Sequence, residues 1–448
     1  MDTQYLETMR ARCAADTYPA AAYFEPEFVA LEKAMLWKHT WLMACRDEVL
    51  ASPGDYYVYD VADESILLLR LNSGEVKAFY NVCPHRGRKL KHGTGNTGDN
   101  VTCRFHGWVW NIDGRIRSIL DRDDWNLTGG LADCDMHLKE VRVADWEGWW
   151  FVTVDPDLKP LHEYLDPLPD VFRNFGYRNT RLAFHKGLKV DCNWKVVMEA
   201  FLESYHVAAT HPQSLNYGVR TPGSAAFGLH SKFFHLFADT RLASDKGKEK
   251  QAIDYRMARY AYVKEMHETL GALHGRHAMV AAARLHELPE NATEQEVAEA
   301  YTRFHAEAMA ADGATYPAIT QEELVRAGTA WHIFPNMIIL PTVDGLQAYR
   351  ARPNGDDPDT AIFEVFWLER SAPDATATCT PEFYPSMEAF KGQNFFLEQD
   401  FSNIAAVQEG VKSAGFQVCR PNPVQEVTIS NFQRNYFDHL AHARGTQE

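Results

Sequence analysis

Two short cysteine–histidine segments constrain the fold of this chain more than any other feature. The first is Cys83–Gly87, which reads CPHRG, and the second is Cys103–Trp108, which reads CRFHGW. Each supplies one thiolate and one imidazole, and such a set can bind an iron–sulfur cluster or a structural zinc ion. Only one residue separates Cys83 from His85, whereas zinc sites usually place two to four residues between their first two ligands. The spacing favours an iron–sulfur cluster and leaves structural zinc as the alternative.

The surroundings of the two segments indicate a pair of tight loops between short β runs. A glycine follows each histidine closely, so the backbone of each loop can approach the sulfides of a cluster. With seventeen residues between His85 and Cys103, the pattern resembles the Rieske motif C-x-H-x₁₇-C-x₂-H. The resemblance implies a [2Fe–2S] cluster in which Cys83 and Cys103 bind one iron ion, and His85 and His106 bind the other.

A second possible metal site follows further along the chain. The spacing predicts a helix over Trp194–Val207 with Glu199, Glu203 and His206 on one face. His211 comes shortly afterwards, and two histidines with one distant carboxylate can form a facial triad for non-haem iron. The segment resembles the N-W-K-x₃-E-x₃-[DE]-x-Y-H-x₄-H segment of Rieske oxygenase catalytic domains. By that resemblance His206 and His211 bind a mononuclear Fe(II) ion.

The third ligand of this triad is expected far downstream, on a helix over about residues 394–412. Its apolar stripe contains a carboxylate, Asp400, which is costly to bury unless it is paired or binds a metal. The apolar residues of this stripe are Leu397, Ile404, Val407 and Val411. The segment is similar to the family pattern E-x-D-x₇-Q, which supplies the carboxylate ligand. We therefore expect Asp400 as the ligand, with Glu398 as the second choice and a plain salt bridge as the alternative.

Glu203 stands where many ring-hydroxylating members of the resembled family have aspartate. There the acid bridges a metal-bound histidine of one subunit and a Rieske histidine of the next. Quaternary-ammonium oxygenases have glutamate at this position, as this chain does. The resemblance thus implies an electron-transfer bridge at Glu203; a solvated surface glutamate is the alternative.

The pattern of expected strands and helices predicts an α+β protein. An N-terminal helical segment over residues 1–50 is expected to pack on the catalytic domain, and an all-β Rieske domain to cover 51–156. A catalytic domain would follow over 157–448, and the resemblance implies a helix-grip (START-like) fold with an antiparallel sheet. Residues 245–312, which are charged, alanine-rich and helical in period, form an expected insertion that serves either as a lid or subunit contact or for packing alone.

Composition narrows the functional classes. The net charge of −16 and the pI of about 5.6 disfavour nucleic acid and anionic membranes, which attract basic proteins. No apolar run is long enough to span a bilayer, and the N-terminus lacks an apolar signal core. Six of the eight cysteines are scattered singly, so a disulfide scaffold is not expected and the cytoplasm is the expected compartment.

The resemblance also implies how such a protein works. A separate reductase or ferredoxin supplies electrons, since no dinucleotide-binding fingerprint is visible here. The oxygenase subunits form a closed ring, either a homotrimer or α₃β₃ with a small β subunit. The expected reaction is hydroxylation or dihydroxylation of a hydrophobic compound, and an aromatic or polycyclic one is expected. The alternatives are a quaternary ammonium or N-methyl monooxygenase and, in another class, a Rieske electron-transfer protein without its own catalysis.

Overall fold

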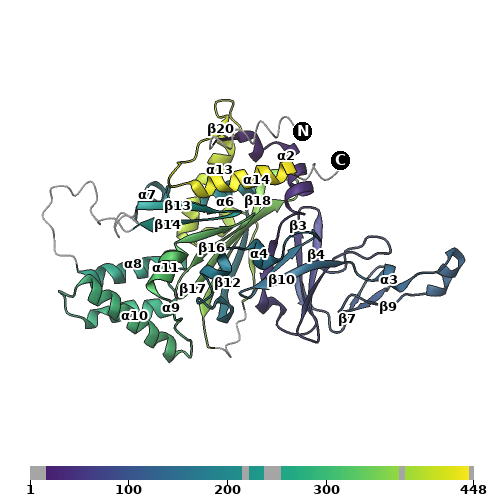
Figure 1. Cartoon of the computed structure of the whole chain (residues 1–448), viewed down its shortest axis with the longest axis horizontal. Coiled ribbons are helices and arrows are strands. Elements are labelled where there is room, and N and C mark those ends of the chain that lie inside the picture. Colours follow the sequence, from purple (N-terminus) through teal and green to yellow (C-terminus); the bar gives the residue numbers. More distant parts are fainter. Residues whose placement is uncertain (1–16, 214–220, 237–253, 373–378, 443–448) are drawn as a thin grey trace. The chain divides into compact units, whose positions relative to one another are not determined.

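The computed structural model describes residues 17–213, 221–236, 254–372 and 379–442 (Figure 1). The chain forms two compact units, one of residues 32–164 and the other of residues 1–31 with 165–448. The α+β class is confirmed, with a β-rich first unit and an antiparallel sheet in the second. No helix among the described residues is long and apolar enough to cross a membrane.

The β-rich unit holds a seven-stranded sheet in the order β2-β11-β10-β5-β4-β3-β6 and a three-stranded sheet in the order β7-β8-β9. Its strands are short and separated by turns, which is the pattern that the sequence predicts. Their bounds are β2 Leu42–Arg46, β3 Asp55–Val61, β4 Glu64–Arg70, β5 Val76–Tyr80, β6 Thr94–Asn96, β7 Asn100–Thr102, β8 Val109–Asn111, β9 Ile116–Ser118, β10 Glu140–Trp146 and β11 Trp149–Thr153. The helices of this unit are η2 Glu32–Leu36, η3 Asp47–Leu50, η4 Arg122–Thr128, α3 Asp133–Met136 and α4 Leu161–Tyr164.

The N-terminal boundary of this unit differs from the expected one. The N-terminal segment expected to be helical over residues 1–50 is not helical throughout, because residues 42–46 form β2, which pairs with β11. This pairing places residues 32–50 in the β-rich unit, whereas 17–31 belong to the second unit. At the other end, α4 extends the unit to Tyr164, eight residues beyond the predicted end at 156. Residues 1–16 of the predicted segment lie outside the described part.

The second unit is built on an eight-stranded sheet in the order β13-β14-β15-β16-β17-β18-β12-β19 (Figure 1). All neighbouring pairs are antiparallel except β12 with β19. The strands are β12 Thr180–Val190, β13 Thr221–Phe227, β14 His230–Leu236, β15 Ala330–Ile333, β16 Met337–Pro341, β17 Gly345–Asn354, β18 Asp357–Arg370 and β19 Glu382–Tyr384; β1 Tyr18–Pro19 pairs separately with β20 Val418–Cys419. A turn at residues 334–336 separates β15 from β16, and the two strands pair with each other.

Helices complete the second unit. Those outside the insertion are η1 Ala20–Tyr23, α2 Pro26–Leu31, α5 Leu168–Val171, η5 Tyr177–Asn179, α6 Trp194–Ala200, α7 Val207–Thr210, α11 Gln321–Ala327, α12 Met387–Phe390, α13 Phe395–Gly410 and α14 Val427–His442. The described part of the insertion contains α8 Tyr255–Leu270, α9 Arg276–Ala283, η8 Arg284–Glu287 and α10 Glu294–Ala311. Thr293 and Glu296 form a capping box at the start of α10. Residues 245–253 of the insertion lie outside the described part.

Candidate metal centres

The two cysteine–histidine loops have the same backbone hydrogen bonds. The amide of Cys83 donates to the carbonyl of Arg88, and its carbonyl accepts from Gly87. The amide of Cys103 donates to the carbonyl of Trp108, and its carbonyl accepts from Gly107. Both glycines have a positive φ, +72° and +71°, which other residues adopt only with strain. Two copies of one tight turn therefore present the four side chains.

These four side chains form a set suited to a dinuclear cluster. The thiols of Cys83 and Cys103 are buried and neither is in a disulfide. The rings of His85 and His106 lie 4.6 Å apart between centroids, and His85 stacks on Trp108.

Their environment supports metal binding. Burial raises the pKa of the Cys83 thiol, and hydrogen bonding with Cys103 adds to this effect. The Nδ1 atom of His106 is buried without a hydrogen-bond partner among the described residues. Two adjacent buried thiols and an unsatisfied imidazole nitrogen are costly groups, and metal coordination satisfies both.

The second candidate site begins where a predicted helix breaks. The helix predicted over 194–207 is wrong, because α6 ends at Ala200 and α7 starts at Val207. Glu203 lies in the break between the two helices, where its carboxylate accepts hydrogen bonds from the amides of Tyr205 and His206. These bonds stabilise the turn that precedes α7 instead of a continuation of α6. Consequently Glu199 does not share a helix face with Glu203 and His206.

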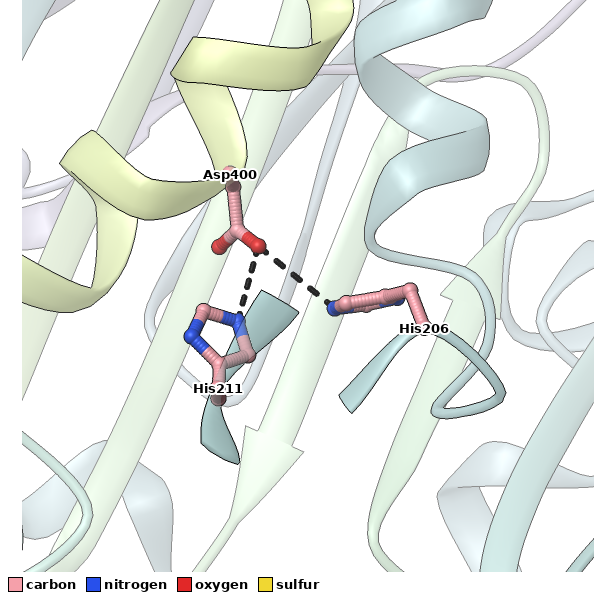
Figure 2. A group of neighbouring side chains, drawn as sticks. All are labelled: His206, His211 and Asp400. Carbon is pink, nitrogen blue, oxygen red and sulfur yellow. Dashed lines mark hydrogen bonds and ion pairs between the residues drawn. The ribbon is translucent and has the colours of Figure 1, made fainter. Parts of the chain in front are cut away.

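His206, His211 and Asp400 lie together, as Figure 2 shows. Their ligand atoms are all within 4.8 Å of one another. Oδ1 of Asp400 is 2.8 Å from Nε2 of His211 and 3.5 Å from Nε2 of His206. His211 and Asp400 are buried, with 2% and 7% of their surfaces exposed. One buried carboxylate facing two imidazole nitrogens is the donor set of a facial triad.

Helix α13 places Asp400 on its buried side. Asn394 caps the helix by accepting from the amide of Leu397. The buried side consists of Leu397, Asp400, Phe401, Ile404 and Gln408. Val407 does not belong to the buried stripe as predicted, because its side chain is exposed. Glu398, the second choice for the ligand, lies at the helix start, where it accepts from the amide of Gly392.

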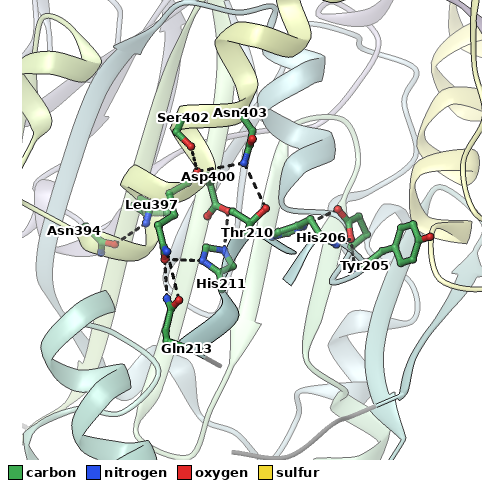
Figure 3. Close-up of polar contacts among 12 residues, drawn as sticks. Tyr205, His206, Thr210, His211, Gln213, Asn394, Leu397, Asp400, Ser402 and Asn403 are labelled. Carbon is green, nitrogen blue, oxygen red and sulfur yellow. Dashed lines mark hydrogen bonds and ion pairs between the residues drawn. The ribbon is translucent and has the colours of Figure 1, made fainter. Parts of the chain in front are cut away.

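Further polar contacts hold the two histidines in place (Figure 3). Nδ1 of His211 lies 2.9 Å from Oε1 of Gln399, and this oxygen also accepts from Nε2 of Gln213. Nδ1 of His206 lies 2.7 Å from Oε1 of Glu203. In both rings Nε2 therefore faces Asp400 while Nδ1 is held by an outer oxygen, the arrangement common among metal-binding histidines.

The electrostatics of this site favour a cation. Burial lowers the pKa of His206, but hydrogen bonds to Asp400 and Glu203 outweigh it and raise the pKa to about 10. The buried carboxylates of Glu203 and Asp400, 8% and 7% exposed, thus stabilise a positive charge on the imidazole between them. A bound metal ion would supply that charge in place of the imidazole proton.

A cavity of about 470 Å³ opens beside these three side chains. Most of its walls are apolar or aromatic, from α6, the sheet, α13 and the insertion. The lining residues include Phe201, Ser204, Phe233, Tyr262, Met266, Leu270, Leu273, Leu340, Tyr349 and Phe396. Four of them, Tyr262 to Leu273, come from the insertion, so its described part forms a wall of the cavity. None of the lining side chains in the described part is a lysine or an arginine.

Comparison with known families decides what kind of protein this is. Residues 177–442 match the family described as ring hydroxylating alpha subunit (catalytic domain). The chain belongs to this family. Residues 40–127 match the Rieske [2Fe–2S] domain. The recognition made from the two motifs is confirmed, and with it a Rieske domain joined to a catalytic domain of the mononuclear non-haem iron type.

Curated relatives of this ring-hydroxylating alpha subunit fall into two groups. It is 29% identical over 204 residues to the carnitine monooxygenase oxygenase subunit of Escherichia coli (strain K12), covering 44% of this chain and 52% of the relative. It is 30% identical over 203 residues to the large oxygenase component of the naphthalene 1,2-dioxygenase system of Pseudomonas aeruginosa, covering 43% and 44%. The chain spans about half the length of the relatives it matches.

Solved structures show the same fold. A quaternary ammonium Rieske monooxygenase in complex with L-carnitine has a TM-score of 0.63 at 16% identity and covers 94% of this chain and 95% of that one. Naphthalene 1,2-dioxygenase from Rhodococcus sp. bound to indole has a TM-score of 0.65 at 18% identity, covering 98% of each chain. These likenesses concern the fold.

Glu199 lies in a separate buried network. It accepts hydrogen bonds from the hydroxyl of Tyr23, at 2.8–2.9 Å, and from Nε2 of Gln433. Burial, only partly offset by these bonds and by Lys195, raises its pKa to about 7. The network joins η1, α6 and α14, so Glu199 has a structural role.

Glu199→Gln should change how stability depends on pH. A carboxyl whose pKa is higher in the folded state stabilises the fold fully below its unfolded pKa, near 4.5, and loses that contribution as pH rises through about 7. The variant lacks this titration, so its free energy of unfolding should fall less between pH 5 and pH 8, by roughly 1–3 kcal/mol. Urea unfolding of both proteins at both pH values measures the difference. An equal change in the free energy of unfolding from pH 5 to pH 8 in the variant and in wild type would contradict it.

Proposed function

We propose that this protein is the oxygenase component of a Rieske non-haem iron oxygenase and that its substrate is a neutral hydrophobic compound. Cys83, Cys103, His85 and His106 would hold the cluster. His206, His211 and Asp400 would hold the mononuclear Fe(II). When bound, these groups supply one-electron transfer and the activation of O₂ for attack on carbon. The observation that carries the proposal is the triad in the wall of a largely apolar cavity.

The side chains of this site have distinct tasks in that reaction. Asp400 supplies the charge that two neutral imidazoles lack, and burial keeps water from competing for it. Gln399 and Glu203 hold Nδ1 of the two histidines, which leaves both Nε2 atoms directed at the same point. The apolar walls orient a substrate beside the triad and exclude solvent from it.

Electrons would come from a separate reductase, with or without a ferredoxin, and pass between subunits of a ring. Glu203 supports this part of the proposal, because its carboxylate bonds Nδ1 of His206 and retains 8% exposure. It can therefore accept from a partner histidine on its other side. A homotrimer and an α₃β₃ assembly both satisfy this arrangement.

The chemistry of the cavity favours an uncharged, aromatic-sized substrate. Its walls carry several aromatic rings, and Phe201, for example, stacks with Phe363 at 5.1 Å and lies 4.7 Å from the ring of Tyr349. A substrate carboxylate would require a cationic partner, and the described lining offers neither lysine nor arginine. A naphthalene-sized compound needs none.

A quaternary ammonium substrate is the second candidate. Its support is the glutamate at position 203 and the match to the carnitine monooxygenase oxygenase subunit. Aromatic rings of the lining, such as Phe233 and Tyr349, could bind a trimethylammonium group through cation–π contacts. Electron transfer without catalysis is the third reading, and it gives the triad no task.

Oxygen consumption with a substrate panel tests these candidates. With a compatible reductase, wild-type protein should consume O₂ with naphthalene or a similar neutral bicyclic compound. Carnitine and glycine betaine should give at most about a tenth of that rate, because the described lining offers their carboxylates no lysine or arginine. Product analysis by mass spectrometry shows whether oxygen enters the compound. Coupled uptake with the ammonium compounds alone would replace the first candidate with the second.

A further inference from the structure

Three polar side chains around the cavity have hydroxyl or amide groups without partners among the described residues. The hydroxyl of Ser204 is buried and makes no hydrogen bond. The same holds for both amide atoms of Gln347, which is fully buried. Tyr349 lines the cavity, is 4% exposed, and its hydroxyl makes no hydrogen bond to a described residue. Most buried polar groups in proteins are satisfied, so this concentration requires an explanation.

Gln347 and Tyr349 occupy one face of one strand. They are two residues apart on β17, which places both side chains on the same side about 7 Å apart. That side faces the cavity, because Tyr349 lines it and Leu340, directly across from Gln347 on β16, lines it too. On its other flank Gln347 pairs with Trp367 of β18.

Residues that line the cavity also surround Gln347 and its neighbour Trp367. Trp367 packs with Leu270, and Leu273 and Phe396 pack against the same cluster. Leu270, Leu273 and Phe396 are all lining residues. Gln347 therefore lies on the same face of β17 as Tyr349 and beside the lining residues, although it is not itself one of them.

We infer that β17 holds a hydrogen-bonding anchor for the substrate, so that the substrate is a neutral ring compound with at least one oxygen substituent. The phenol of Tyr349 donates to that oxygen, and the carboxamide of Gln347 pairs with it or with a second polar atom. A bare hydrocarbon would leave all these groups unsatisfied. The inference rests on the proposed function and adds the chemical class of the substrate. Ser204 lies two residues from His206, so its hydroxyl is left out of the test.

Equilibrium binding to the iron-loaded protein, without reductant, tests the anchor. Wild type should bind 1-naphthol about tenfold more tightly than naphthalene in calorimetric titration, which is the effect of one or two net hydrogen bonds. Tyr349→Phe should remove most of this preference by weakening 1-naphthol alone. Tyr384→Phe is the matched control, because its hydroxyl bonds Glu382 and it is not among the lining residues. This control should keep the full preference.

Gln347→Leu separates an anchor from a structural role. Removing an unsatisfied buried amide should raise the Tm by roughly 2–5 °C while weakening 1-naphthol binding. Gln433→Leu, which removes a buried amide that bonds Tyr23 and Glu199, should lower the Tm. If a bound water hydrogen-bonds the amide of Gln347, then Gln347→Leu should lower the Tm as Gln433→Leu does.

The contrary results are distinct from failure of the proposed function. The inference is overturned if wild type binds naphthalene at least as tightly as 1-naphthol, if it binds neither, or if Gln347→Leu lowers the Tm. Iron and sulfide content and substrate-coupled O₂ uptake test the oxygenase itself without reference to Tyr349 or Gln347. An oxygenase that prefers the bare hydrocarbon would keep the proposed function and remove the anchor.

Discussion

Asp400→Asn should lose mononuclear iron and at least about a hundredfold of its turnover while its Rieske cluster stays intact. Changes to the outer partners of metal ligands typically cost 10–100-fold, so loss of the one anionic ligand should exceed that range. Asp400 faces both Nε2 atoms at 2.8 and 3.5 Å, and no other carboxylate among the described residues completes the group of three. The amide also leaves the buried His211 and the partly exposed His206 without the carboxylate that faces both Nε2 atoms.

Glu398→Gln is the matched control for this change. It makes the same carboxylate-to-amide replacement two residues away on α13, and its Oε1 can still accept from Gly392. Iron content, the cluster spectrum and turnover should match those of wild type. Turnover lost in Glu398→Gln and kept in Asp400→Asn would transfer the ligand role to Glu398.

Mixed oligomers should recover activity that neither parent has. Cys103→Ser subunits would lack the cluster, and Asp400→Ala subunits would lack the mononuclear iron, so each homo-oligomer should be inactive. If electrons cross between subunits through Glu203, a one-to-one mixture places an intact cluster beside an intact iron site at about a quarter of the positions. Co-expression with two affinity tags and tandem purification provides the mixed protein.

The rate of the mixed protein distinguishes two routes for the electron. Purification through both tags leaves only rings that hold both chain types, and each such three-membered ring has one productive junction out of three. About a third of the wild-type rate therefore supports transfer between subunits, and adding Glu203→Gln to the Asp400-intact chain should lower it further. Transfer within one chain predicts no recovery at any mixing ratio. Mixtures of each parent with itself, purified in the same way, give the background.

The metal ligands could be predicted from the sequence because their spacing carries chemistry directly. The same tight turn occurs twice between Cys83 and His106, each time with its glycine at a positive φ. Because each turn is formed by a few consecutive residues, the sequence alone shows it. Asp400 was found because a carboxylate in a buried helical stripe needs a partner. In both cases the short-range pattern already contains the physical constraint.

The path of the chain between these ligands was less predictable. Periodicity predicts a helix through His206, but the carboxylate of Glu203 accepts from the amides of Tyr205 and His206 in the turn before α7, and such a local competition has no periodic signal. Strand β2 was missed because its pairing with β11 spans about a hundred residues. The outer partners Gln399 and Gln213 could not be identified, since nothing in an amide's neighbours along the chain marks it as a histidine partner.

The lining of the cavity could be predicted only in part from the sequence. Phe201, Phe233, Leu340, Tyr349 and Phe396 line it, and all are apolar or aromatic residues of segments that the sequence predicts to be strands or helices. The role of the insertion was open, and its residues Tyr262 to Leu273 form a wall in the structure. Which polar groups lack partners depends on three-dimensional packing, so the unpaired amide of Gln347 became visible only there.

Metal and acid-labile sulfide analysis of the purified protein tests the central claim most directly. A Rieske cluster together with a mononuclear site predicts about three iron ions and about two sulfide ions per chain, with an EPR signal from the cluster on reduction. Asp400→Asn should then retain about two of each. Colourless protein with stoichiometric zinc, no sulfide and no EPR signal would contradict the account.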